Sequence, residues 1–174
     1  MKNQKVLFLT QGAVIAALYV VLCQLFAPIS FRDVQVRIAE GLTILPYFTP
    51  VAIPGLFVGC LLGNMLAGAI PVDVVFGSLT TLIGALGTWA IGNWIRRKHP
   101  EGSKIKCLLP VPPILANAVI IPFILYYGYG INVPIPIQMA TVGAGEILSC
   151  GVIGMIILFA LEKVAPGIFR PQGN

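Results

Sequence analysis

The sequence predicts an all-α membrane protein, with one domain over residues 1–174 that crosses the bilayer as six helices. Composition is the first observation behind this prediction. Hydrophobic residues make up 57% of the chain and charged residues only 10%, whereas a soluble domain carries about 25% charged residues. The second observation is the division of the chain into apolar runs, separated by short connections rich in Gly, Pro or charge.

The first three predicted helices cover residues 6–27, 34–48 and 51–69. The run 6–27 reaches the length of about 20 apolar residues that spans a bilayer. No small-x-small cleavage site ends it, so we interpret it as a retained helix and not as a signal peptide. The run 34–48 is short and carries charge in its first turns. Pro54 falls in the first turn of 51–69, where its missing N–H does little harm.

The other three predicted helices cover residues 74–95, 107–127 and 137–161. Pro122 lies inside 107–127 and predicts a kink there. Residues 96–106 form the only long hydrophilic loop, between the fourth and fifth helices, and a connection rich in Gly and Pro precedes the sixth.

Positive charge gathers on one side of the predicted bundle. Six spans place both termini on the same side, together with nine of the eleven Lys and Arg residues: Lys2, Lys5, Arg96, Arg97, Lys98, Lys104, Lys106, Lys163 and Arg170. Basic residues are enriched in cytoplasmic loops, so we expect both termini to be cytoplasmic. The net charge of +5 therefore reflects topology, and no nucleic-acid partner is expected.

Small residues at four-residue spacing predict close helix contacts, because they let backbones approach each other in a membrane. Such stripes occur in the third helix, at Gly55, Gly59, Gly63 and Ala67, and in the fourth, at Gly77, Thr81, Gly84 and Thr88. For both we favour packing inside the bundle. The first helix holds two overlapping pairs, Gly12/Ala16 and Ala13/Ala17. These pairs either pack internally or receive a partner protein.

Polar residues inside the apolar runs are the candidates for a binding site, because ionisable groups in a bilayer usually face a cavity or each other. Asp33, Arg37 and Glu40 follow i, i+4, i+7 spacing and would share one face of an α-helix. Glu146 lies near the middle of the last span. The remaining candidates are Asn64, Asp73, Asn117, Tyr126, Tyr127 and Gln138.

Structural roles remain open for several of these candidates. Arg37 and Glu40 would neutralise each other as a pair, Glu146 would serve as a protonated structural acid, and the tyrosines would form an interfacial belt.

Enzymatic and metal-binding motifs are missing from the sequence. It contains no G-x-x-x-x-G-K-[ST] nucleotide-binding loop and no H-E-x-x-H, and His99 is its single histidine. Its four cysteines stand singly in or beside apolar runs, as small hydrophobic residues do. We therefore expect neither an enzyme nor a resident metal or cofactor.

Two stretches closely resemble the QueT family: ISFRDVQVRIAEGLTILPYFTPVAIPGLFVGCLLGN, residues 29–64, and PVDVVFGSLTTLIGAL, residues 71–86. The likeness extends from the first to the last predicted helix. The family is known as the substrate-binding S-components of energy-coupling-factor (ECF) transporters linked to queuosine precursors.

The resemblance implies a six-helix S-component in the plasma membrane of a prokaryote. Such a subunit binds its micronutrient near the outer face and pairs with a transmembrane coupling subunit and two ATPases. The implied ligands are 7-deazaguanines such as preQ1, preQ0 or queuine. S-components use an A-x-x-x-A-like patch on the first helix to contact the coupling subunit, and Ala13 and Ala17 match it here, beside Gly12 and Ala16.

A 7-deazaguanine suits a carboxylate that accepts two hydrogen bonds from its donor edge. Glu40 and Glu146 are the candidates for this role, Asp73 for meeting the amine of preQ1, and Arg37 for binding the carbonyl or holding Glu40. Three amides and two rings complete the set: Asn64, Asn117 and Gln138 for hydrogen bonds, and Tyr126 and Tyr127 for stacking. Arg32 and Asp33 would then lie on a loop over the site.

Two alternatives stay open. The chain would act as a proton-coupled homodimeric transporter if Glu146 or Glu40 carried the proton, or as an S-component for another vitamin-like heterocycle. A membrane scaffold without a small-molecule ligand is a third interpretation.

Overall fold

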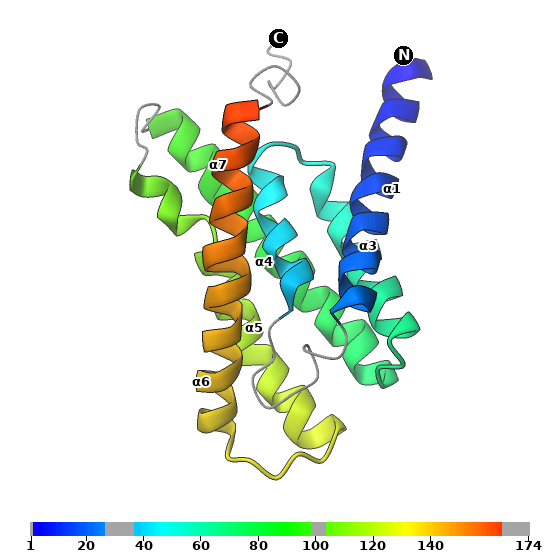
Figure 1. Cartoon of the computed structure of the whole chain (residues 1–174), viewed down its shortest axis with the longest axis vertical. Coiled ribbons are helices and arrows are strands. Elements are labelled where there is room, and N and C mark those ends of the chain that lie inside the picture. The colour runs from blue at the N-terminus through cyan, green and yellow to red at the C-terminus, as the bar shows by residue number, and fades with distance from the viewer. Residues whose placement is uncertain (1, 27–36, 99–103, 165–174) are drawn as a thin grey trace.

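The computed structural model describes residues 2–26, 37–98 and 104–164, and every regular element within these ranges is a helix. Arg32 and Asp33 lie outside them, so a charged loop over the site stays a prediction. The long helices are α1, Lys2–Leu25, and α4, Pro71–Lys98. In Figure 1, α1 is seen along its length and α4 crosses behind other elements.

Two further rods are built from consecutive helical segments. The first comprises η2, Lys104–Leu108, α5, Val111–Phe123, and the π-helical turn η3, Ile124–Gly128. The second comprises α6, Ile135–Glu146, the π-helical segment η4, Ile147–Ile153, and α7, Gly154–Val164. The change to π geometry begins just after Pro122, where the sequence predicts an irregularity.

Among the described residues, four helical segments are long and apolar enough to cross a membrane, by length and composition: Gln4–Leu25, Pro71–Lys98, Ile105–Gly128 and Ile135–Val164. The sequence predicts six. The other two helical segments are α3, Ala52–Leu66, which rises only about 22 Å, and η1, Ile38–Tyr47. Neither has the length to span a hydrocarbon core of about 30 Å on its own.

The second predicted helix differs in type from the expectation. Ile38–Tyr47 is a 3₁₀-helix, and Arg37 precedes it, so an α-helical face shared by Arg37 and Glu40 is a wrong prediction. Gly41 and Pro46 lie within this segment, and both disfavour a regular α-helix. Every residue from 39 to 46 is buried, so packing by its neighbours determines the form of η1.

The first turn of α1 and the last turn of α7 lie at the same end of the bundle (Figure 1). An even number of crossings predicts this arrangement. The last turn of α4 lies at that end too, whereas the connection between η3 and α6 lies at the opposite end. Which end faces the cytoplasm remains a prediction from charge.

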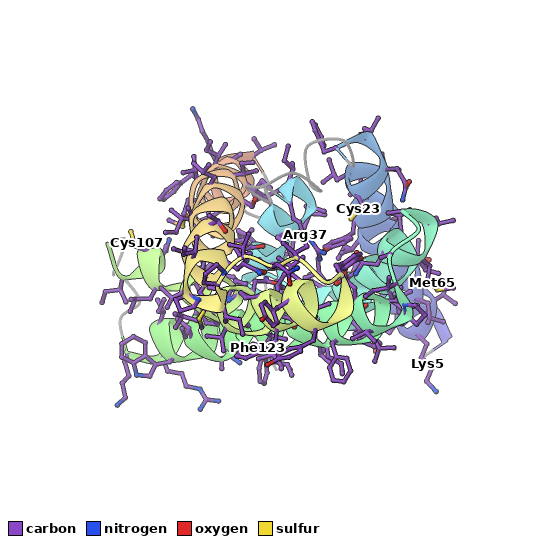
Figure 2. The ribbon with its side chains drawn as sticks, turned by 90° about the horizontal axis from the view of Figure 1, so that it is seen from below. Lys5, Cys23, Arg37, Met65, Cys107 and Phe123 are labelled. Atoms are coloured by element: carbon purple, nitrogen blue, oxygen red, sulfur yellow. The ribbon has the colours of Figure 1, made fainter. Side chains whose placement is uncertain are left out.

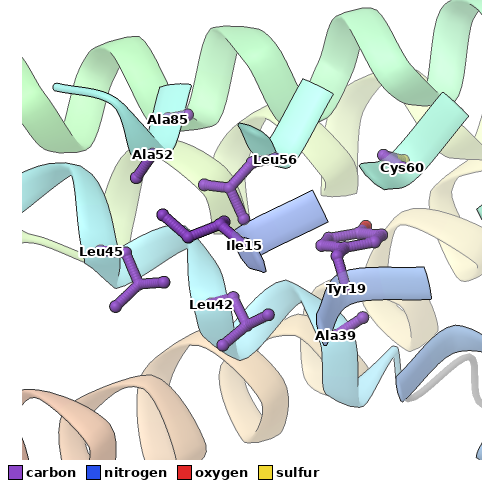
Figure 3. Packing of buried hydrophobic residues seen from close by; sticks show 9 residues of the cluster. All are labelled: Ile15, Tyr19, Ala39, Leu42, Leu45, Ala52, Leu56, Cys60 and Ala85. Atoms are coloured by element: carbon purple, nitrogen blue, oxygen red, sulfur yellow. The ribbon is translucent and has the colours of Figure 1, made fainter. Parts of the chain in front are cut away.

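The main hydrophobic core surrounds η1 and joins it to α1, α3 and α4 (Figure 3). Its buried members are Ile15, Tyr19, Ala39, Leu42, Leu45, Ala52, Leu56, Cys60 and Ala85. The glycines of α3 face α1: a Cβ on Gly59 would lie 2.7 Å from Tyr19 Cβ and 3.0 Å from Ala16 Cα. The stripe of small residues on α3 therefore serves internal packing.

Two glycines of α4, Gly84 and Gly87, face the prolines of α5. A Cβ on Gly84 would lie 2.7 Å from Pro113 Cα, and one on Gly87 would lie 2.4 Å from Pro112 Cβ. Both distances are shorter than real Cβ contacts. Glycine at these positions lets the two helices cross closely.

Polar contacts fasten the ends of the elements that surround the core. Arg96 donates a hydrogen bond to the Tyr47 carbonyl, and its guanidinium lies 5.1 Å from the centre of the Tyr47 ring, so the end of η1 is held on α4. Lys106 and Glu162 form an ion pair of 2.7 Å between η2 and α7.

Candidate functional site

A carboxylate stands at the centre of the bundle. Glu40 is fully buried in the first turn of η1, and Tyr19 and Thr81 donate hydrogen bonds to its Oε1, the latter at 2.7 Å. Its Oε2 is also buried and has no hydrogen-bond partner among the described residues. A buried polar atom without a partner costs about 1–3 kcal/mol. Oε2 is therefore an acceptor ready for a donor from a ligand.

A second carboxylate lies close to the first. A carboxylate oxygen of Glu40, a carboxylate oxygen of Glu146 and the Sγ of Cys150 lie within 4.8 Å of one another, and all three residues are buried. Cys150 Sγ donates to Glu146 Oε2 at 3.2 Å and to the Glu40 carbonyl at 3.4 Å. Two ionised carboxylates at this separation repel each other. The pair would be stabilised by a proton, a cation or a hydrogen-bond donor between its members.

These three residues offer carboxylate and thiol groups, which divalent metals accept as ligands. A closed zinc site takes four protein ligands, and this group supplies three. The arrangement suits a hydrogen-bonding ligand at least as well as an ion.

The third acid belongs to a separate group of contacts at the start of α4. Arg37 Nη2 lies 3.5 Å from Asp73 Oδ2, and Tyr129 OH donates to the same oxygen at 2.9 Å. Burial and the Asp73 carboxylate raise the pKa of Tyr129, which keeps its hydroxyl protonated and able to donate. The ion pair described for Arg37 is with Asp73 and not with Glu40. Asp73 Oδ1 is buried and has no described partner.

One face of α4 connects the two groups of contacts. Asp73, Gly77 and Thr81 follow four-residue spacing on this helix. A Cβ on Gly77 would lie 2.8 Å from Asp73 Oδ1 and 3.1 Å from Asn64 Nδ2. Glycine at position 77 therefore leaves room for both polar atoms.

Asn64 makes only long contacts, 3.5 Å to the Asp73 carbonyl and 3.6 Å to Cys60 Sγ. Its amide is held weakly and remains free to turn toward a ligand.

Together these residues form one unit, which we call the polar cluster, and all but the exposed Tyr129 are buried: Tyr19, Arg37, Glu40, Asn64, Asp73, Thr81, Tyr129, Glu146 and Cys150. Figure 2, viewed from the end opposite the termini, places Arg37 near the middle of the bundle. A cavity of about 20 Å³ borders Arg37 and Asn64, and it has room for about one water molecule. A larger ligand needs the surrounding elements to move apart.

The polar cluster unites five of the nine substrate-binding residues predicted from the sequence: Arg37, Glu40, Asn64, Asp73 and Glu146. Gln138 instead donates to the carbonyls of Ile131 and Val133, at 3.1 and 2.7 Å, and so holds the connection between η3 and α6. Asn117 donates to the Pro113 carbonyl at 3.1 Å within α5. The remaining carbonyl oxygens of both amides are buried without a described partner.

The structure does not bring Tyr126 and Tyr127 to the polar cluster. Their rings meet edge to face at 5.0 Å, and their exposed fractions are 37% and 74%. Tyr127 lines an open apolar groove on the outside of α4 and α5, with Val72 and Phe76. This position fits an aromatic residue at a membrane interface.

Sequence reasoning missed Tyr19, Thr81, Tyr129 and Cys150 as members of the site. Tyr19 offers one local signal, a hydroxyl in the middle of a largely apolar span. Its side chain lies between Ala39 and Cys60 in Figure 3, so the ring belongs to the core and its hydroxyl to the site.

The four small residues predicted to receive a partner divide into two sets. A Cβ on Gly55 would lie 2.9 Å from the Gly12 carbonyl, and Ala16 is buried against Gly59, so this pair faces α3. Ala13 and Ala17 are exposed. Ala13 borders a groove of about 260 Å³ on α1 and α3, which Phe8, Leu9, Pro54 and Val58 also line.

The model of the family described as QueT transporter matches residues 9–163. The chain belongs to the QueT transporter family. A curated relative, the "Queuosine precursor transporter QueT" of Lactococcus lactis subsp. cremoris (strain MG1363), is 34% identical over 85 residues. The aligned part covers 48% of this chain and spans half the length of that relative. No solved structure matches the chain.

Proposed function

We propose that this QueT family member is the substrate-binding subunit of an ECF-type importer and captures a queuosine precursor, a 7-deazaguanine, for uptake. Family membership supports the transport role, and the name of the Lactococcus relative supports the substrate class. The ECF assignment rests on the resemblance and on the lack of a nucleotide-binding loop in this sequence. Energy would then come from partner ATPases through a coupling subunit.

The observation that carries the substrate proposal is the unpartnered Oε2 of Glu40. The donor edge of a 7-deazaguanine presents a ring N–H and an amino group side by side. A buried carboxylate that keeps one oxygen free satisfies such an edge with charge-assisted hydrogen bonds. Glu146 nearby offers a second acceptor, and Asn64 an amide. Tyr19 and Thr81 fix the orientation of Glu40 through its other oxygen.

The experiment is a binding screen on the purified chain, by thermal shift and calorimetry. Queuine, preQ1 and preQ0 should raise the melting temperature with increasing concentration, because a ligand that binds only the folded state stabilises it. Guanine tests whether the deazapurine ring is required, and riboflavin is the unrelated control. Saturable binding of riboflavin, with none of the deazaguanines, would overturn the proposed substrate.

A second candidate function follows from the closeness of Glu40 and Glu146. Two carboxylates in contact share a proton readily, which suits a proton-coupled transporter that works without ATPases. Reconstituting the chain alone in vesicles separates the two functions. Flux driven by a proton gradient favours this second candidate, whereas co-purification with ATPase subunits favours the importer.

A further inference from the structure

We infer that the polar cluster binds a planar ligand with an aliphatic ammonium group more tightly than a ligand that has the same ring but no positive charge. We infer also that Asp73 binds this ammonium group. The inference rests on the proposed function and deepens it, since it distinguishes among members of one substrate class. It is drawn from the charge of the cluster, the free oxygen of Asp73 and the spacing along α4.

The charge of the cluster is unbalanced. It contains three carboxylic acids, Glu40, Asp73 and Glu146, and one basic residue, Arg37. If Glu40 and Glu146 share one proton while Asp73 and Arg37 are ionised, the cluster carries a net charge of −1. All are buried, with exposed fractions of 8% or less. A buried negative charge is costly unless a cation or proton accompanies it, so a cationic ligand gains affinity that a neutral one does not.

Asp73 keeps the better acceptor for such a cation. Asp73 Oδ2 already accepts a hydrogen bond from Tyr129 and forms the ion pair with Arg37. Its Oδ1 is buried without a described partner, and it lies where a side chain at position 77 would be. The 3.5 Å contact with Arg37 is longer than the 2.7–2.9 Å usual for a charge-assisted hydrogen bond. Arg37 therefore leaves part of the Asp73 charge for another donor.

The spacing along α4 fits one ligand that meets both acids. Asp73 and Thr81 are eight residues apart, or about 12 Å along the helix axis, and Thr81 holds the carboxylate of Glu40. This rise separates main-chain positions, and Asp73 Oδ1 lies beside Gly77, midway between them. A compact ligand, such as a fused bicyclic ring with a one-carbon ammonium arm, would therefore meet both acids. Its ring edge would meet Glu40 and its arm Asp73.

The pair preQ1 and preQ0 tests the inference, because they share one ring and differ in a single substituent, an aminomethyl group against a nitrile. An aliphatic amine of this kind is protonated at pH 7. Calorimetry on the full chain should give at least tenfold tighter binding of preQ1. Asp73→Asn should lower the affinity for preQ1 at least tenfold and change the affinity for preQ0 by less than threefold. Glu162→Gln, which breaks the ion pair with Lys106 away from the cluster, is the matched control and should leave both affinities unchanged.

The inference is overturned if the wild-type chain binds preQ1 and preQ0 with equal affinity. This test does not need the Asp73→Asn variant, so it still applies where that variant fails to fold. Equal weakening of both ligands by Asp73→Asn would also overturn it, since Asp73 would then act on the ring or on the fold. If neither compound binds, the proposed function fails and takes the inference with it.

Discussion

At the scale of single residues, the carboxylates of Glu40 and Glu146 differ in how their neighbours satisfy them. Among the described residues, Glu40 Oε1 accepts two hydroxyl hydrogen bonds and its Oε2 none, whereas Glu146 Oε2 accepts one from a thiol. A thiol is a weak donor. Both acids therefore keep acceptor capacity for a ligand, and Glu40 is the more firmly oriented of the two.

Glu40→Gln and Glu146→Gln, tested separately, show which acid reads the ligand. In Glu40→Gln, Tyr19 and Thr81 hold the amide oxygen, so the NH₂ group takes the position of Oε2 and meets the donors of the ligand. We expect at least tenfold weaker binding, or about 1.4 kcal/mol, for the variant whose acid contacts the ring. Calorimetry with the best ligand of the screen measures it, with Glu162→Gln as control. Two folded variants that bind like wild type would make both acids structural.

Four members of the cluster were predictable because they are charged residues inside apolar runs, where an ionisable group usually faces a cavity or another polar group. Tyr19 and Cys150 were not, because a hydroxyl or a thiol is tolerated in an apolar helix without any partner. Their contacts also join distant positions: Tyr19 lies 21 residues from Glu40, and Cys150 lies 110 residues from it. Only the fold brings these groups together.

At the scale of elements, the close approach of α1 and α3 depends on glycine. A Cβ on Gly59 would come within 3.0 Å of backbone atoms of Ala16 and nearer still to Tyr19. Neither neighbour is the flexible end of a side chain. The contact also positions Tyr19 for its hydrogen bond to Glu40, so packing here supports the site.

Gly59→Ala should destabilise the protein by about 1–3 kcal/mol, the usual cost of overpacking a well-packed interior. Thermal unfolding in detergent measures the effect as a lowered melting temperature. Gly143→Ala in α6 is the matched control, since its new Cβ would meet Ala118 at an ordinary 3.5 Å. Equal melting temperatures for the two variants would contradict the packing argument.

The sequence predicted where helical segments lie better than what kind they are. Apolar runs revealed α1, α4 and the two composite rods, because length and hydropathy are local properties. The 3₁₀ form of η1 depends on its surroundings instead. A Cβ on Gly41 would lie 3.1 Å from the Ser149 carbonyl, and one on Gly154 would lie 3.3 Å from the Gly41 carbonyl. These contacts come from residues more than a hundred positions away.

At the scale of the whole molecule, charge and geometry give one orientation. The first turn of α1 and the last turns of α4 and α7 lie at one end of the bundle (Figure 1), and these turns carry Lys2, Arg96, Arg97, Lys98 and Lys163. We expect this end to face the cytoplasm. Cysteines introduced at Lys98 and Asn132, in a background without native cysteines, should be labelled by an impermeant reagent from opposite sides of the membrane. Labelling of both from one side, or the reverse pattern, would refute the orientation.

The outer surface of α1 carries the last prediction, which concerns the coupling subunit. Ala13 and Ala17 are exposed, and they lie one turn apart on a face that the rest of the described chain leaves uncovered. In a membrane, helices associate through small residues that let backbones approach. Ala13→Trp or Ala17→Trp should therefore hold a partner helix away and reduce uptake by cells at least tenfold, with less coupling subunit recovered in co-purification.

Leu18→Trp is the matched control for this surface, because Leu18 is also exposed on α1 but on a different face. It should leave uptake near the wild-type level. Ligand binding by the purified Ala13→Trp chain should also persist, since Tyr19, the residue of α1 that contacts Glu40, points to the opposite side of the helix, into the core. Normal uptake with both Ala13→Trp and Ala17→Trp would show that this face has no role in coupling. Loss of ligand binding would show instead that α1 acts through the packing of α3 and the polar cluster.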